Sequence, residues 1–141
     1  MNNKEKKYDL IKFEDGDFSL DVKVSPYEDT VWLSQNEMAM LFDTTKQNIS
    51  LHIKNIMSDG ELDVSVVKDF LTTASDGKKY LTKMYNLDMI IAVGYRVNSK
   101  RGTLFRRWAS FVLKQYLLNG YAVNSNRVVA YESNLLKLEV S

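Results

Sequence analysis

The sequence contains no cysteine, and it has only one histidine and one proline. The absence of cysteine excludes disulfides, thiolate catalysis and cysteine-based zinc sites, and His52 alone cannot build a typical zinc site. No apolar run approaches the ~20 residues that span a bilayer, and no apolar segment follows the charged N-terminus as in a secretory signal. We therefore expect a cytoplasmic protein about the size of one domain, with no membrane partner, no metal and no cofactor.

Charge is unevenly distributed along the chain. Residues 1–43 hold five Lys and ten acidic residues, residues 44–88 hold six of each, and residues 89–141 hold eight Lys or Arg and two acids. This asymmetry indicates either a partner that carries phosphates or an internal charge match, and a solvated basic face is the simpler alternative.

The N-terminal part predicts a small antiparallel sheet. Residues 18–24 alternate apolar and polar side chains, as a half-buried strand does. Residues 8–13 predict its partner, joined through a tight turn at Asp15-Gly16. A second turn around Pro26 leads to a short third strand at residues 30–33.

Residues 35–54 predict a helix-turn-helix. Ser34 and Glu37 have the spacing of a capping box at the start of the first helix. Asp43 lies in the turn, where a left-handed backbone is needed and Asp tolerates it. Thr45 is the expected N-cap of the second helix, and its inward face consists of three isoleucines: Ile49, Ile53 and Ile56. His52, at the edge of that face, is expected to pack rather than to bind a ligand.

The outer face of this second helix has the composition of a DNA-contacting surface. No acid lies between Asp43 and Asp59, so nothing on the helix repels phosphates. Glutamine pairs well with adenine, and lysine with guanine or phosphate. The expected contacts to bases are Gln47, Ser50, Leu51 and Lys54, with Lys46 on a phosphate. A plain helical hairpin with a polar outer face is the alternative.

The C-terminal half predicts a hairpin and two further helices. Two β-rich runs flank a tight turn at Asp76-Gly77, and Asn86 then caps a short apolar helix. A long helix from Ser99 to about Leu118 carries an apolar stripe of five residues: Leu104, Phe105, Trp108, Phe111 and Val112. Leu113 and Leu117, on its other side, suggest cover by the tail or by another subunit.

The start of this long helix is a second candidate contact with DNA. Lys100 and Arg101 follow Ser99, which is the expected cap or donor, and free backbone N–H groups at a helix start attract anions. We expect Lys100 and Arg101 to contact phosphates. A surface ion pair with the acidic N-terminal sheet is the alternative, and Arg106 or Arg107 can equally be a structural ion-pair partner.

Several stretches together resemble the RhuM family, bacterial proteins labelled virulence-associated. They are VWLSQNEMAMLF, SLHIKNIMSDGEL, TTASDGKKY, YNLDMIIAVGYRVNSKRGTLFRRWA and VLKQYLLNGYAVN, between about Val31 and Asn126. The resemblance implies kinship with phage antirepressor domains of the Bro-N and KilA-N type, which carry an apolar helix followed by a basic helix with F-x-x-W, here Phe105 to Trp108. It also implies a DNA-binding regulator, and a full-length protein longer than this chain.

The expected fold is therefore α+β. Residues 1–63 would form the N-terminal β-hairpin and a winged-helix-like helix-turn-helix. Residues 64–126 would form a β-hairpin and a two-helix RhuM or Bro-N-like part. Residues 127–141 would form a helical tail that continues in a longer protein.

The expected function is transcription regulation by a homodimer that binds double-stranded DNA in the major groove. The alternative is an antirepressor-type module that binds another regulator protein and not DNA. No enzyme activity is expected. A tight turn explains Asp76-Gly77, and the acids Glu61, Asp63 and Asp69 lack an evident shared face for a metal nuclease.

Overall fold

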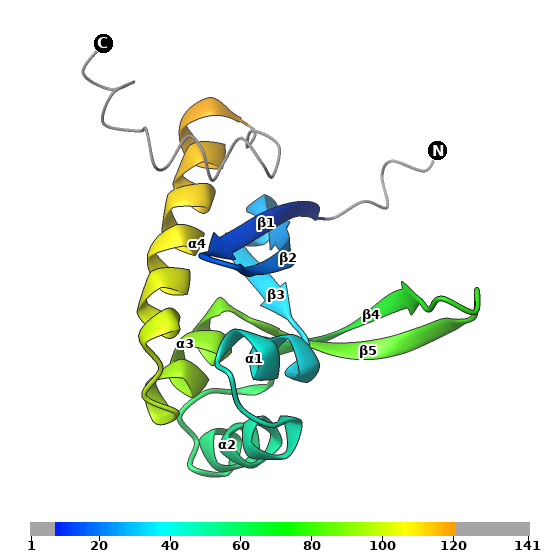
Figure 1. Ribbon diagram of the computed structural model, residues 1–141, viewed down its shortest axis with the longest axis vertical. Coiled ribbons are helices and arrows are strands. Elements are labelled where there is room, and N and C mark those ends of the chain that lie inside the picture. Colours follow the sequence, from blue (N-terminus) through cyan, green and yellow to red (C-terminus); the bar gives the residue numbers. More distant parts are fainter. Residues whose placement is uncertain (1–7, 121–141) are drawn as a thin grey trace. The chain divides into compact units, whose positions relative to one another are not determined.

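A computed structural model describes residues 8–120 of the chain (Figure 1). The chain divides into two compact units, one built from Met1–Val31 and Leu104–Ser141 and the other from Trp32–Thr103. The described residues form four α-helices and a five-stranded antiparallel sheet with the strand order β1-β2-β3-β5-β4. The predicted α+β class is confirmed. The predicted tail at residues 127–141 lies outside the described residues, and the predicted domain ranges stay predictions.

The first unit contains the N-terminal hairpin that the alternating pattern predicted. Strands β1 (Asp9–Asp15) and β2 (Phe18–Ser25) pair antiparallel, with Asp15 opposite Phe18. Gly16 in the tight turn has φ 62°, a conformation that glycine adopts without strain. One face of β2 is buried through Leu20, Val22 and Val24.

The same unit contains most of helix α4 (Lys100–Asn119). The ring of Phe13 on β1 meets Phe105 and Trp108 edge-on, with ring centroids 5.3 and 5.4 Å apart. Aromatic pairs in this geometry stabilise a core beyond the area that they bury. The unit therefore packs its hairpin against an aromatic row of α4.

The prediction that Leu104 belongs to the core stripe of α4 was wrong, and Leu113 is buried on the side where cover was expected. Leu104, expected in the core stripe, is 44% exposed, whereas Leu113, expected on the opposite side, is only 9% exposed. The buried sector of the helix includes the i, i+4, i+8 row of Phe105, Ala109 and Leu113. Leu104 itself lies at the edge of that sector, although Trp108 and Val112, one and two turns further along, are buried. Leu117 is 83% exposed, so the cover that was expected for it stays a prediction.

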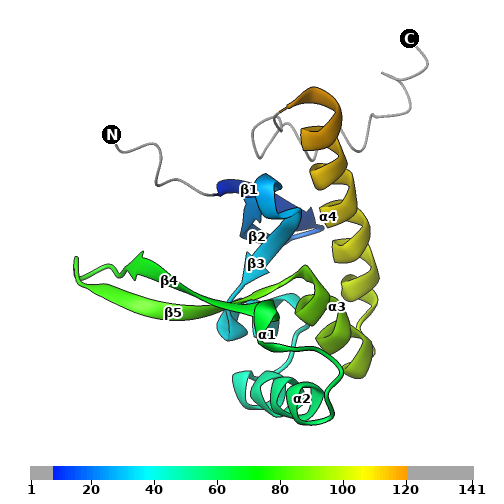
Figure 2. The same cartoon turned by 180° about the vertical axis from the view of Figure 1, so that it is seen from behind.

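The second unit holds the helix-turn-helix, the second hairpin and a third helix. Its elements are the end of β3 (Thr30–Leu33), α1 (Gln35–Leu41), α2 (Lys46–Ser58), β4 (Val67–Thr73), β5 (Lys79–Asn86), α3 (Leu87–Arg96) and the first residues of α4. Trp32 and Leu33 of β3 pair with β5, and β5 pairs with β4 from Tyr85 opposite Val67 to Lys79 opposite Thr73. Figure 2 shows α1, α2 and α3 of this unit from behind.

The helix starts of this unit agree with the predicted caps. At α1, the backbone N–H of Glu37 donates to Ser34 Oγ and that of Ser34 donates to Glu37 Oε1, which completes the capping box. Thr45 Oγ1 accepts from the N–H of Asn48, and Asn86 Oδ1 accepts from that of Met89. Each cap satisfies N–H groups that a helix start leaves unpaired. Within residues 8–120, no helix combines the length and apolar character needed to cross a membrane.

Candidate nucleic-acid interface

Helix α2 has one buried face and one exposed face. Ile49 and Ile56 have no exposed surface and Ile53 is 7% exposed, so the predicted inward face is confirmed. The five residues of α2 that were predicted to contact DNA all lie on its exposed side: Lys46, Gln47, Ser50, Leu51 and Lys54. Leu51 is the one large apolar side chain among them and is 53% exposed. The structure thus brings these five side chains together on one helix.

The turn before α2 fixes where that helix begins. Asp43 has φ 54°, the left-handed conformation that its position in the turn predicted. The N–H of Thr44 donates to Ala39 O at 3.0 Å, and Asn48 Nδ2 donates to Thr44 Oγ1 at 3.0 Å. These bonds link the end of α1 to the first turn of α2. The N-terminal end of the candidate surface is therefore held by the turn itself.

The first turn of α4 lies against the end of α1. Arg101 Nη1 donates to the carbonyl oxygen of Leu41 at 3.1 Å. Leu41 is the last residue of α1, so its carbonyl is one that the helix leaves without an internal partner. The N–H of Gly102 donates to Ser99 Oγ, which confirms Ser99 as a cap. Lys100 is exposed, whereas Arg101 is partly buried.

Two glycines allow this close packing. A Cβ on Gly94 of α3 would lie 3.0 Å from Phe42 Cζ, and a Cβ on Gly102 would lie 3.3 Å from Phe42 Cε1. Phe42 directly follows α1 and is 6% exposed. The ring of Phe42 therefore packs where α3 and the start of α4 have no side chains. This contact places Lys100 and Arg101 near the turn of the helix-turn-helix.

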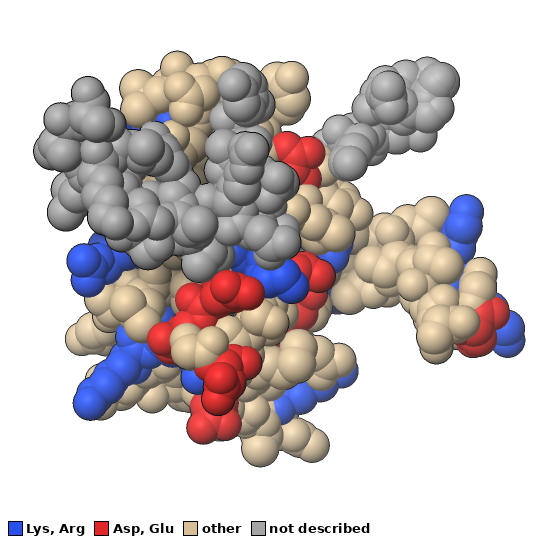
Figure 3. All heavy atoms as spheres, turned by 45° about the horizontal axis from the view of Figure 1, so that its top comes forward, with Lys and Arg blue, Asp and Glu red and all other residues tan. Residues whose placement is uncertain are grey.

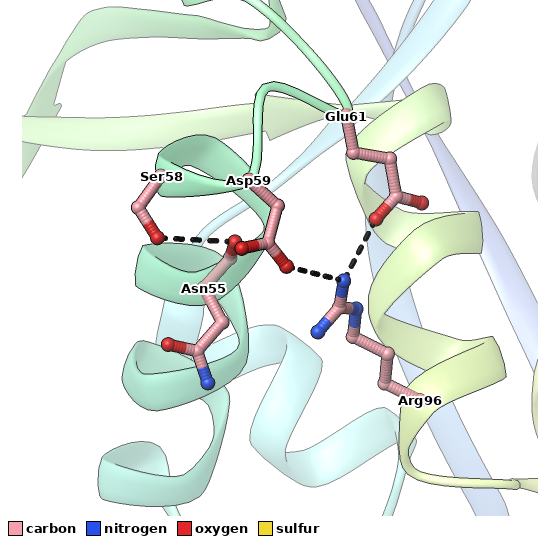
Figure 4. A network of polar contacts seen from close by, with 5 residues as sticks. All are labelled: Asn55, Ser58, Asp59, Glu61 and Arg96. Atoms are coloured by element: carbon pink, nitrogen blue, oxygen red, sulfur yellow. Dashed lines mark hydrogen bonds and ion pairs between the residues drawn. The ribbon is translucent and has the colours of Figure 1, made fainter.

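An ion-pair network lies at the C-terminal end of α2 (Figure 4). Arg96 Nη2 at the end of α3 contacts Glu61 Oε1 at 2.8 Å and Asp59 Oδ2 at 3.5 Å. The hydrogen bond to Glu61 is the main cause that raises the pKa of Arg96 above its ordinary value, and Asp59 adds to it. The network ties the end of α2 to α3, so α2 is fixed at both ends.

The acidic residues after α2 each have a structural role. Glu61 pairs with Arg96, and Asp69 pairs with Lys83 across the hairpin at 3.7 Å. Hydrogen bonds from the side chain and then the backbone of Ser65 lower the pKa of Asp63. Among residues 8–120, no three His, Asp or Glu side chains gather as metal ligands would.

The hairpin β4–β5 carries charges of both signs near its turn. The N–H of Gly77, which has φ 83°, donates to Ala74 O, and the N–H of Lys78 donates to Asp76 Oδ1. These bonds explain Ser75 to Lys79 as a turn. Figure 3 shows basic and acidic atoms together at the end of the projecting hairpin.

Three features of this unit were not predicted from the sequence. They are the bond from Arg101 to Leu41, the pairing of Arg96 with Glu61, and the packing of Phe42 on Gly94. Each joins residues that are far apart in the sequence, and no local spacing signals such a contact. The only cue was the position of two glycines inside helical segments, where glycine is unfavourable without a packing reason.

A comparison with family models found one match. The model of the Virulence protein RhuM family matches residues 65–136, just over half of the chain. The match includes β4, β5, α3 and α4 and begins after α2, so it leaves out the helix-turn-helix. Searches of curated proteins and of solved structures found no match.

Proposed function

The chain belongs to the RhuM virulence protein family, and we propose that it is a regulator that binds double-stranded DNA through α2. One observation carries this proposal. Four polar or basic side chains and one leucine are exposed on one face of α2, while the opposite isoleucines anchor the helix in the unit. A helix with this division can enter the major groove without disturbing its own packing.

The roles of the side chains follow from their chemistry. Gln47 and Ser50 present hydrogen-bonding groups to base edges, and Leu51 can contact a thymine methyl group. Lys54 can reach guanine or a phosphate, and Lys46 at the helix start suits a phosphate. The helix N-terminus adds an attraction for anions. In this arrangement the exposed Leu51 would be covered by DNA.

The elements around α2 support a winged form of the motif. The hairpin β4–β5 follows α2 after a short 3-10 helix (Val64–Val66), and β5 pairs with β3, the strand that precedes α1. A hairpin in this place is a wing, which would lie beside the DNA that α2 enters. We also infer that the apolar α3 and the basic start of α4 correspond to a Bro-N-like part, with Lys100 on a phosphate. Arg101 remains a predicted phosphate contact, although it already binds Leu41.

A salt titration of binding to random and genomic duplex fragments tests this proposal. We expect affinity to fall steeply as salt rises, because each neutralised phosphate releases counterions. Gln47→Ala combined with Lys54→Ala should weaken binding by about 10-fold or more. Lys114→Ala, an exposed lysine of the other unit, removes charge elsewhere and should leave affinity nearly unchanged. An absence of binding at low salt would refute the proposal.

The second candidate is an antirepressor module that binds a regulator protein. Exposed apolar side chains support this candidate. Leu117 and Leu118 at the end of α4 are 83% and 63% exposed, and Leu51 on α2 is 53% exposed. Apolar contacts of this kind are typical of protein interfaces. This candidate predicts no DNA binding at any salt concentration. It also predicts that Leu51→Ser abolishes capture of a regulator.

A further inference from the structure

The hairpin β4–β5 exposes an apolar pair. It extends as a two-stranded ribbon beyond α1 and α2 of its own unit (Figures 1 and 2). Leu71 and Leu81 lie directly opposite each other on this ribbon and are 61% and 71% exposed. A two-stranded ribbon is marginally stable alone in water, and an added strand stabilises it. The ribbon therefore has both an apolar surface and a reason to gain a neighbouring strand.

Strand β4 is at the edge of the sheet and has a defined set of outward backbone groups. The N–H of Ala74 donates to Lys78 O at 2.8 Å, so this pair is hydrogen-bonded. Bonded and non-bonded pairs alternate in an antiparallel ladder. The even-numbered residues of β4 therefore bond to β5, and the odd-numbered Asp69, Leu71 and Thr73 point their N–H and C=O groups to the outer edge. The strand has no proline, and its register with β5 has no bulge, so it lacks two common protections of an edge.

We propose that β4 pairs antiparallel with β4 of a second copy of the chain, with the two Leu71 residues opposite each other. The outward groups of the odd-numbered residues then meet their counterparts in both copies. One apolar row then crosses four adjacent strands, in the order Leu81 and Leu71 of one copy, then Leu71 and Leu81 of the other. Neighbouring apolar side chains in such a row stabilise a sheet.

Charge complementarity favours a second copy in this register. Asp69 already pairs with Lys83 on its own β5. The register places Asp69 opposite Thr73 of the second copy, and Thr73 lies beside Lys79 on β5. Each Asp69 then has Lys83 of its own copy on one side and, beyond Thr73, Lys79 of the second copy on the other. No like charges are opposed on β4. A register shifted by two residues toward Val67 would place Asp69 against Leu71 and break the apolar row.

The symmetry of this pairing suits DNA binding. Tyr85 lies on the same face of the hairpin as Leu81, and its hydroxyl accepts a hydrogen bond from Gln35 of α1. A two-fold axis perpendicular to the sheet keeps this face of both copies on the same side, so both copies present α1, the first helix of the helix-turn-helix, on that side. Two-fold symmetry of this kind matches the two half-sites that helix-turn-helix dimers bind. The inference rests on the proposed function as its dimer interface, but it is measured without DNA, so the two can fail separately.

Sedimentation of the full chain without DNA tests the interface. We expect a monomer–dimer equilibrium in which Leu71→Lys weakens dimerisation at least 10-fold, because two lysines then face each other at the axis. Leu81→Lys makes the same change one strand away and should weaken it less. Circular dichroism and thermal melts should show that both variants remain folded. A chain that is monomeric at every concentration, or equal effects of both variants, would overturn the β4 pairing.

A cross-link provides a second measurement. The chain has no cysteine, so Leu71→Cys introduces a single thiol per copy. Directly opposed bonded residues have Cα atoms about 5.5 Å apart, within the ~4.4–6.8 Å that a disulfide spans. Mild oxidation should link Leu71→Cys into a dimer. Leu81→Cys, about three strand spacings from its counterpart, should not cross-link, and cross-linking of Leu81→Cys at the same rate would contradict the register.

Discussion

Helix α2 and the first turn of α4 both carry basic residues that the sequence assigned to DNA, but the structure uses them differently. The two lysines of α2, Lys46 and Lys54, are exposed on a helix that has no acidic residue. At the start of α4, Lys100 is exposed, whereas Arg101 is partly buried and donates to Leu41. Basic residues on a helix can therefore serve in two ways. They can form an exposed binding surface, or they can hydrogen-bond to a neighbouring helix.

The difference comes from what surrounds each helix start. The α2 start is formed by a turn with small polar caps, Thr45 and Thr44, that leave its outer face open. The α4 start packs under Phe42 beside Gly94, so Arg101 is near a helix end with unpaired carbonyls. A cation there can satisfy the carbonyl and interact favourably with the helix dipole.

The largest expected effect is a difference in stability between substitutions on the buried and the exposed face of α2. Ile49→Ala removes a side chain with no exposed surface and should lower the free energy of unfolding by about 2–5 kcal/mol. Ser50→Ala, the next residue on the exposed face, should change stability by less than ~0.5 kcal/mol while weakening binding to DNA. Chemical denaturation measures the first quantity and fluorescence anisotropy the second. Equal stability losses would mean that α2 is not divided in this way.

The packing under Phe42 can be tested with the two glycines. Alanine is favoured over glycine inside a helix by about 1 kcal/mol, but overpacking costs about 1–3 kcal/mol. Gly94→Ala, with its Cβ 3.0 Å from the Phe42 ring, should destabilise by about 1 kcal/mol net. Gly102→Ala, at 3.3 Å, should be nearly neutral. Combining Gly94→Ala with Phe42→Leu should restore part of the loss if the ring is the obstacle, and thermal melts would show it.

Arg101 and Lys100 can be compared directly. Arg101→Met keeps the length of the side chain but removes its hydrogen bond to Leu41, and should cost about 0.5–1.5 kcal/mol of stability. Lys100→Met should be close to neutral. The salt dependence of DNA binding provides the contrast. The salt slope is the slope of the logarithm of the binding constant against the logarithm of the salt concentration. If Arg101→Met reduces this slope by about 1 without loss of stability, Arg101 contacts a phosphate and does not stabilise the fold through Leu41.

The smallest expected effect concerns a single lysine of α2. Lys54→Ala should weaken binding to all duplex sequences about equally if Lys54 contacts a phosphate, and should lower the salt slope by about 1. If Lys54 contacts a base, discrimination between sites should fall instead. Binding measured at several salt concentrations on two sequences distinguishes these outcomes. No change in either quantity would remove Lys54 from the interface.

The sequence predicted the elements of the fold better than the contacts between them. Caps such as Ser34, Thr45 and Asn86 act over three residues, and the alternation in β2 follows from the pleat of a strand, so both are visible locally. The width and centre of a buried helix face depend on what covers it, which is why Leu104 was placed in the core stripe and Leu113 outside it. The partners of Arg96 and Arg101 lie on other helices and could not be derived from spacing.

The candidate surface shows the same limit. The sequence selected Gln47, Ser50 and Lys54 because helical periodicity separates them from the isoleucines, and their exposure agrees with that selection. Their contact with DNA stays a prediction. The sequence does not indicate that β4 is an edge strand, because exposure of a backbone edge depends on the order of strands and not on the side-chain pattern.

The division of the chain into two units also affects the order in which the units can fold during synthesis. Trp32–Thr103 is one continuous segment, whereas the other unit combines residues before it with residues after it. During synthesis, all contacts of the continuous unit are available once Thr103 has emerged. The N-terminal hairpin must wait for Phe105 and Trp108, with which Phe13 packs. Domains generally fold as units from the N-terminal side, but here the interrupted unit would be completed last on the ribosome.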